Sequence, residues 1–217
     1  MWKMPSSLAA GGRPILVVDL DGTLIPNLVE WEELRARIAE MLNVHPDKLR
    51  PLGERVLSMG LDEETLRRVL GVVEDYELRA LKKLDPGILA ERRRLLADVK
   101  RRGFVIVIVS MRSSQSLWEA LRAMEAEDLV DMAVSRDNAP GRLEQLRLIA
   151  SRFKDRCMVF VGDTERDLEA GSSLGIYTII LRDYRELEQA IVEAFRHCLG
   201  EGLSSGAAAS HSYTVYY

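Results

Sequence analysis

Two aspartates, one residue apart, follow the first long apolar run of the chain. The apolar segment 15–18 leads directly into Asp19 and Asp21, and the chain then reaches a glycine, Gly22. A short apolar run bounded by turn signals is typical of a buried parallel strand. If Leu20 points back into the protein, Asp19 and Asp21 share the opposite direction, toward the edge where open α/β sheets bind ligands. Two like charges this close need a cation, a shared proton or distinct roles. We therefore interpret the two aspartates as residues that take part in the protein's chemistry and not as structural residues.

The same pattern occurs at two further apolar runs. The run 157–161 is followed by Asp163 and, four residues later, by Asp167, while the run 104–109 ends at Ser110. Because parallel strands all present their carboxyl ends at one edge of a sheet, we expect these polar residues to lie near the aspartate pair.

These motifs, in this order, resemble the haloacid dehalogenase superfamily of phosphohydrolases. The sequence DLDGT stands at 19–23, a strand-terminal serine at Ser110, and GDxxxD at 162–167. The resemblance extends from residue 15 to about residue 183, and it points to the phosphoglycolate-phosphatase-like group. It implies a Rossmann-like parallel sheet, a helical cap inserted after the first motif, Mg²⁺ as cofactor and an aspartyl-phosphate intermediate.

The resemblance also implies roles for the acidic residues. Asp19 is expected to be the nucleophile, and Asp21 the acid that protonates the leaving group and later activates water. Magnesium favours hard oxygen ligands. Asp19, Asp163 and the backbone carbonyl of Asp21 are expected to supply them, with Asp167 binding directly or through water.

Residues near the first and second motifs are expected to bind phosphate. The Ser110 hydroxyl is expected to donate to a phosphoryl oxygen, and we place Thr23 and Met111 in the same site. Arg112 could form a fork onto a phosphate or another substrate anion, although 111–113 could equally be a loop leading into a capped helix.

The sequence departs from the family at its third motif, which is usually a lysine. No lysine stands in the expected region, 138–141. Arg142 opens the following helix near the carboxyl edge of the sheet, and we predict that it replaces the lysine. Arg136 is the alternative, whereas Lys154 lies at the far end of that helix.

The hydrophobic pattern predicts an α/β fold of about five parallel strands with crossover helices. We assign 14–26 and 87–199 to this core, 27–86 to a small helical cap between the first and second core strands, and 1–13 and 200–217 to flexible ends, although the closing five residues could add a strand. Strands are predicted at 15–20, 104–110, 130–135, 157–162 and 177–182. Helices are predicted at 88–102, 113–127, 141–153, 165–174 and 185–198.

Bulk properties restrict the partners and the compartment. A net charge of -4 and a pI near 5.6 argue against nucleic-acid or membrane-surface binding. The basic stretch 91–102 is expected to be the solvated side of a helix that packs on the sheet. Cys157 and Cys198 are too few for a disulfide framework, so we expect reduced thiols and a cytoplasmic protein. The oligomeric state is left open between a monomer and a homodimer.

The predicted function is a magnesium-dependent phosphatase acting on a small phosphorylated metabolite. A phosphotransferase or mutase would use the same residues and differ only in the acceptor. A receiver-like signalling domain would need Asp19 but leaves Asp21 and the helical insertion unexplained. A non-catalytic relative is suggested only by the missing lysine.

Overall fold

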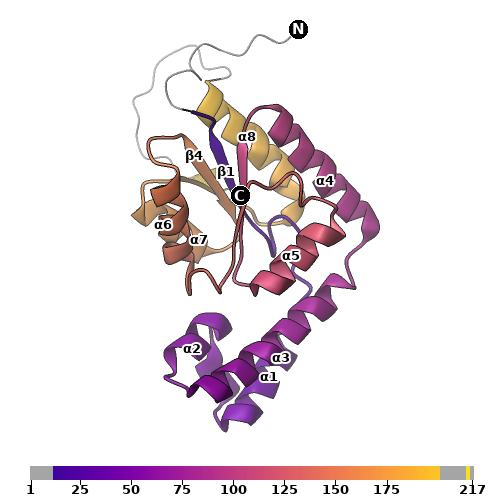
Figure 1. Ribbon diagram of the computed structural model, residues 1–217, viewed down its shortest axis with the longest axis vertical. Coiled ribbons are helices and arrows are strands. Elements are labelled where there is room, and N and C mark those ends of the chain that lie inside the picture. The colour runs from indigo at the N-terminus through magenta and orange to yellow at the C-terminus, as the bar shows by residue number, and fades with distance from the viewer. Residues whose placement is uncertain (1–11, 201–213, 216–217) are drawn as a thin grey trace.

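The computed structural model describes residues 12–200 and 214–215, and its centre is a parallel β-sheet (Figure 1). Five strands lie in the order β3-β2-β1-β4-β5, and the two-residue β6 pairs with the outer side of β5. The predicted α/β fold with a parallel sheet is therefore confirmed. The strands are β1 (Ile15–Asp19), β2 (Val105–Val109), β3 (Met132–Val134), β4 (Met158–Gly162), β5 (Tyr177–Ile180) and β6 (Thr214–Val215).

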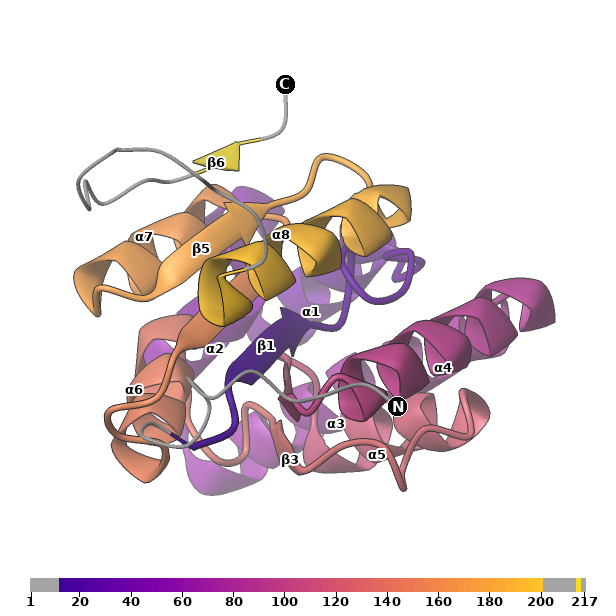
Figure 2. The same ribbon diagram turned by 90° about the horizontal axis from the view of Figure 1, so that it is seen from above.

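Helices cover both faces of this sheet, as Figure 2 shows from above. One face carries α4 (Pro86–Arg101), α5 (Ser114–Ala123) and α8 (Leu187–Leu199), and the other carries α6 (Arg142–Arg152) and α7 (Glu165–Ser173).

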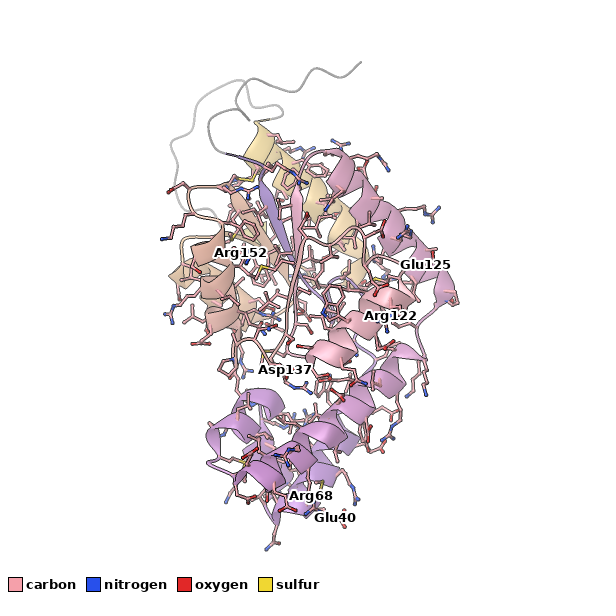
Figure 3. All side chains as sticks on the ribbon, viewed as in Figure 1. Glu40, Arg68, Arg122, Glu125, Asp137 and Arg152 are labelled. Atoms are coloured by element: carbon pink, nitrogen blue, oxygen red, sulfur yellow. A yellow bond between two sulfur atoms is a disulfide. The ribbon has the colours of Figure 1, made fainter. Side chains whose placement is uncertain are left out.

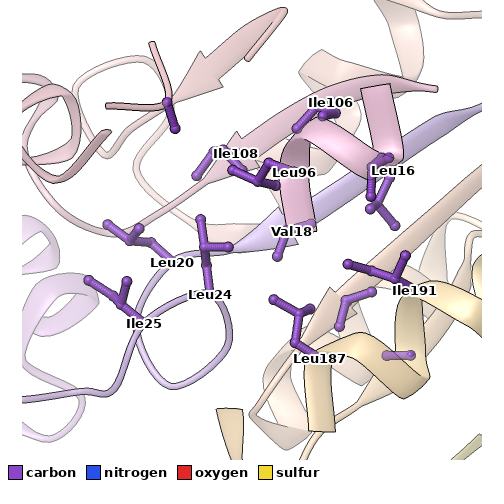
Figure 4. Packing of buried hydrophobic residues seen from close by; sticks show 14 of the residues in the cluster. Leu16, Val18, Leu20, Leu24, Ile25, Leu96, Ile106, Ile108, Leu187 and Ile191 are labelled. Carbon is purple, nitrogen blue, oxygen red and sulfur yellow. The ribbon is translucent and has the colours of Figure 1, made fainter. Parts of the chain in front are cut away.

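Alternate residues of β1 serve the two faces. Leu16 and Val18 join the first hydrophobic cluster, which Figure 4 shows in part, whereas Ile15 and Val17 join the second. All four are fully buried. A strand that is buried on both faces needs an unbroken apolar sequence, and this is the run from which the strand was predicted.

The predicted helices differ from the observed ones mainly at their ends. The helix predicted over 113–127 ends at Ala123, because Glu125 adopts a left-handed backbone with φ 52°. The helix predicted over 185–198 begins as a short 3-10 turn, η3 (Tyr184–Glu186), before α8. The basic stretch is not wholly solvated, since Arg92 is buried and donates to the carbonyl of Tyr184.

The segment between β1 and α4 forms a helical cap with a hydrophobic core of its own (Figure 1). It comprises α1 (Trp31–Leu42), η2 (Pro46–Leu49), α2 (Leu52–Ser58) and α3 (Glu63–Leu81). Asp62 caps α3 by accepting from the Thr65 amide at 2.9 Å. The buried cap residues, such as Leu34, Ile38 and Val69, cluster with one another and not with the sheet.

The expectation of two reduced thiols is wrong for this structure. Cys157, just before β4, and Cys198, near the end of α8, form a disulfide across a Cα–Cα distance of 5.7 Å. The pairing arises because α8 packs along β4, which places its last turn beside the start of that strand. The argument for a reducing compartment therefore has no support from these cysteines.

The two ends of the chain were predicted to be flexible, with a possible strand in the last five residues. Most of 1–13 and 200–217 lies outside the described residues, but Thr214–Val215 pairs with Ile179 and Ile180 as β6. Among the residues that the structure describes, no helix is both long and apolar enough to cross a membrane.

Candidate active site

The carboxyl end of β1 closes into a tight turn that presents its aspartates. The Leu24 amide donates to the Asp19 carbonyl at 3.1 Å, and the Ile25 amide donates to the Leu20 carbonyl at 2.9 Å. Gly22 takes a left-handed backbone with φ 82°, and a Cβ there would lie 2.1 Å from the Asp163 carboxylate. Only glycine allows both the turn and this close approach.

Three carboxylates meet at this edge of the sheet. Asp19 ends β1, Asp163 follows β4, and Asp167 lies in the first turn of α7; each offers an oxygen within 4.8 Å of the others. Burial and the neighbouring carboxylates raise the pKa of Asp19 well above its usual value. Burial, followed by the charge of Asp167, raises the pKa of Asp163 to about 6.

Arg142 supplies the positive charge inside this cluster. Its Nε donates to Asp167 Oδ1 at 2.6 Å, its Nη2 to Asp19 Oδ1, and its Nη1 to Gln145 Oε1 at 3.0 Å. From the first residue of α6, the guanidinium therefore bridges the carboxyl end of β1 and the first turn of α7. Of the three basic candidates for the third motif, the structure brings this one to Asp19.

Asp167 and Gln145 hold the cluster in place. Asp167 Oδ2 accepts from the hydroxyl of Thr164 at 2.6 Å and from its amide at 3.1 Å. The Asp167 amide in turn donates to the Thr164 hydroxyl at 3.2 Å, which completes a capping box at the start of α7. Gln145 is fully buried and donates to the Ser110 carbonyl at 2.9 Å. The sequence analysis missed Gln145, although its spacing from Leu146 and Ile149 places it on the buried face of α6.

Asp21 lies apart from the three carboxylates and pairs with Arg112. Both of its oxygens accept from this arginine, from Nε and from Nη2, each at 2.7 Å. For Arg112 the sequence left open a contact with a substrate anion and a loop that leads into a capped helix. In the structure its third nitrogen, Nη1, also has protein acceptors, the Glu77 carbonyl and the Ser116 hydroxyl. A bidentate pair of this kind fixes both orientation and distance.

Another buried ion pair, between Glu77 and Arg136, joins the cap to the core. The sequence analysis missed Glu77. Glu77 of α3 accepts from Arg136 Nη1, and from the Ser113 amide at 3.2 Å. Burial raises the pKa of the Glu77 carboxyl in spite of the arginines beside it. Arg136 also donates to the Met111 carbonyl at 3.0 Å, so it lies at the junction of cap and core and not against Asp19.

The other predicted phosphate-binding residues lie around the same edge. Ser110 is buried directly after β2, and its hydroxyl accepts from the Arg112 amide at 3.1 Å. Met111 reaches toward α2, because a Cβ on Gly53 would lie 3.7 Å from its methyl carbon. Thr23 is fully buried, and among the described residues its hydroxyl has no hydrogen-bond partner. The contacts of these residues with a ligand stay predictions.

A cleft of about 590 Å³ opens between the cap and the core beside Arg142. Glu54 and Leu57 of α2 line it on the cap side, and Arg142, Arg166 and Glu169 line it on the core side. Asp137, labelled in Figure 3, marks the edge of the core that faces the cap. This volume is in the range of sites that bind small molecules.

The acidic cluster fits a hard divalent cation. Its donors are three carboxylates, and Arg142 is the cation that faces them. Burial, and after it the charge of Asp167, raises the pKa of Asp163 in spite of this arginine. The absence of a Cβ at Gly22 lets the Asp163 carboxylate pack directly against the turn after β1, which brings it close to Asp19. A cation with oxygen ligands would relieve this repulsion.

The chain belongs to the haloacid dehalogenase-like hydrolase family, whose model matches residues 14–175. This range includes the cap and every residue of the site described above. No curated protein matches the sequence closely enough to count as a relative.

Solved structures share the fold at low sequence identity. A haloacid dehalogenase-like family protein from Streptococcus pneumoniae superposes with a TM-score of 0.56 at 15% identity, covering 84% of this chain and 98% of its own. A predicted phosphoglycolate phosphatase from Haemophilus somnus gives 0.55 at 17% identity, covering 77% and 84%. A provisionally assigned β-phosphoglucomutase from Thermotoga maritima gives 0.51 at 21% identity, covering 83% and 91%.

Proposed function

We propose that this hydrolase is a magnesium-dependent phosphatase that cleaves small phosphorylated metabolites through an aspartyl-phosphate on Asp19. The observation that carries the proposal is the convergence of Asp19, Asp163 and Asp167 on Arg142 at the carboxyl edge of the sheet. The names of two structural neighbours, one a phosphatase and one a mutase, agree with phosphoryl chemistry. The small cleft beside Arg142 supports a metabolite as substrate.

In the first step an Asp19 oxygen attacks phosphorus, and the bond between phosphorus and the ester oxygen breaks. Asp21 gives its proton to the departing oxygen, because a free alkoxide is a poor leaving group. The Arg142 charge, held beside Asp19, stabilises the negative charge that spreads over the phosphoryl oxygens.

In the second step Asp21 removes a proton from water, which attacks the phosphorus. The bond between phosphorus and Asp19 then breaks and releases inorganic phosphate, which restores the free carboxylate. Asp19, Asp163 and Asp167 would hold Mg²⁺, with the Asp21 carbonyl as a further ligand. Bound there, the ion neutralises charge on the phosphoryl group.

A panel of phosphorylated metabolites, assayed for phosphate release with Mg²⁺ and with EDTA, tests the proposal. We expect release to require the metal, and Asp163→Ala to raise the Mg²⁺ concentration needed for half-maximal activity at least tenfold. Glu165→Ala is the matched control, because it removes an exposed carboxylate two residues away. Equal activity in metal-free buffer would contradict the proposal, and recovery of an isomerised sugar phosphate in place of free phosphate would assign the mutase alternative.

A further inference from the structure

The cap sends one acidic side chain into the core, and core donors surround it. Glu77 is only 1% exposed, although it lies in a cap helix. Its carboxylate accepts from Arg136 and from the Ser113 amide, while its backbone carbonyl accepts from Arg112 Nη1 at 2.8 Å. These donors come from the loops that follow β2 and β3.

Arg112 connects this cap residue to Asp21. The same guanidinium that donates to the Glu77 carbonyl donates through Nε and Nη2 to both oxygens of Asp21. A guanidinium is planar and its donors form a rigid fork, so fixing one side of it also fixes the direction of the other. The Ser116 hydroxyl, 3.0 Å from Nη1, is the remaining acceptor on the cap-facing side.

The position of Glu77 along α3 suits this connection. It lies one turn before the end of α3 at Leu81, and α4 of the core begins at Pro86. The contact is therefore close to the point where the chain passes from cap to core. Figure 1 shows α3 leading up to α4 at this point. A buried charge pair is weak evidence for stability, because hydrophobic residues of similar volume often stabilise as well or better. The Glu77–Arg136 pair does fix the position of α3 against the loop that follows β3, and a positioning role requires this geometry.

We propose that Glu77 is a positioning residue that fixes Arg112, and through it the orientation of the Asp21 carboxylate, while the cap is docked on the core. The inference rests on the proposed function, in which Asp21 transfers protons to and from the reacting oxygens. It ties the proton-transfer step to the position of the cap. The Glu77 carboxylate anchors α3 through Arg136 and the Ser113 amide, and this anchoring keeps the Glu77 backbone carbonyl against Arg112. If a change of the side chain displaces α3, the carbonyl leaves Arg112 and the fork is held only by Ser116 and Asp21.

The experiment compares two leaving groups in single-turnover assays of Glu77→Gln. p-Nitrophenolate departs without a proton, whereas the alkoxide of an alkyl phosphate, chosen as the best alkyl substrate of the wild type, needs one. We expect Glu77→Gln to slow release of the alcohol about tenfold or more, part of the hundredfold or larger contribution of a general acid. Release of p-nitrophenolate in the same variant should stay within about twofold of the wild type.

Two further variants separate positioning from a loss of structure. Tyr76→Phe changes the neighbouring residue, whose hydroxyl donates at 2.6 Å to Glu33 of α1 inside the cap, and should leave the ratio of the two rates unchanged. The double variant Glu77→Met/Arg136→Met removes both charges without leaving one unpaired, so it should fold even if Glu77→Gln does not. It should show the same selective loss.

Equal slowing of both leaving groups, unchanged rates or faster release of the alcohol would each overturn the positioning role. Failure of the proposed function has a different signature. In that case the wild type itself would release neither alcohol nor p-nitrophenolate in the presence of Mg²⁺.

Discussion

The two ends of the sheet are built for different purposes. At the carboxyl end, Asp19, Asp163 and Asp167 crowd together around one arginine. At the amino end, the Cys157–Cys198 disulfide ties β4 to α8, and Arg13 donates to the carbonyls of Gly103 and Phe104. Buried like charges cost stability, whereas a cross-link and satisfied backbone groups contribute to it.

This difference predicts that substitutions at the two ends separate into two classes. Changes at the carboxyl end should lower activity with little loss of stability. Changes at the amino end should lower stability with little loss of activity.

Replacing the nucleophile should have the largest effect. Asp19→Asn should lower kcat by roughly four orders of magnitude or more, as removal of a nucleophile does in other covalent hydrolases. Its free energy of unfolding in metal-free buffer should fall by no more than about 1 kcal/mol, because the variant removes one of several mutually repelling buried carboxylates. Phosphate release and urea denaturation measure the two quantities.

Asp155→Asn is the matched control for this substitution. Asp155 is exposed near the amino end, in a left-handed conformation that asparagine also tolerates. Both quantities should stay at wild-type values. A tenth of wild-type activity in Asp19→Asn would exclude this residue as the nucleophile.

Removing the disulfide should produce the opposite result. Cys157→Ala/Cys198→Ala should lower the free energy of unfolding by about 4 kcal/mol, since the bond closes a loop of 41 residues. At 25 °C its kcat should stay within about twofold of the wild type. Adding a thiol reductant should destabilise the wild type by a similar amount and leave the double variant unaffected. A matching loss of kcat would mean that the two ends are coupled.

Substitutions of Arg142, also at the carboxyl end, should lower kcat by less than Asp19→Asn does. Arg142→Ala should lower kcat about a hundredfold or more, the scale of losing one preorganised charge contact. Arg142→Lys should retain part of the activity, because lysine keeps the charge but loses the fork that bridges Asp19 and Asp167.

Lys154→Ala is the control and should leave kcat unchanged, because Lys154 is exposed and lies two residues beyond the far end of α6. The assignment of Arg142 to the third motif would be contradicted if Arg142→Ala kept a near-normal kcat while a Lys154 or Arg136 variant lost most of its kcat.

The elements of the core could be predicted because they follow from local patterns. Apolar runs of strand length alternate with amphipathic helices, and each predicted core strand is present. The motifs also indicated which residues gather at the carboxyl edge, because all the strands end there. Helix ends were less certain, since the left-handed conformation of Glu125 has no apolar signal in the sequence.

Contacts between distant segments could not be predicted in this way. Pairing Cys157 with Cys198 requires knowing that α8 packs along β4. The burial of Glu77 requires knowing that α3 contacts the loops after β2 and β3. One signal was present, because Glu77 lies four residues after Val73, on the face of α3 that the protein buries. A carboxylate on an apolar helix face needs a buried partner.

The most direct test of the account is the identity of the residue that becomes phosphorylated. Wild-type protein should be mixed with its best substrate and Mg²⁺, quenched in acid within one turnover, reduced with borohydride and mapped by mass spectrometry. Borohydride converts a phosphorylated aspartate to homoserine, and we predict that conversion at Asp19 alone. Conversion at another aspartate, or turnover without any modified aspartate under conditions where the intermediate accumulates, would contradict covalent catalysis by Asp19.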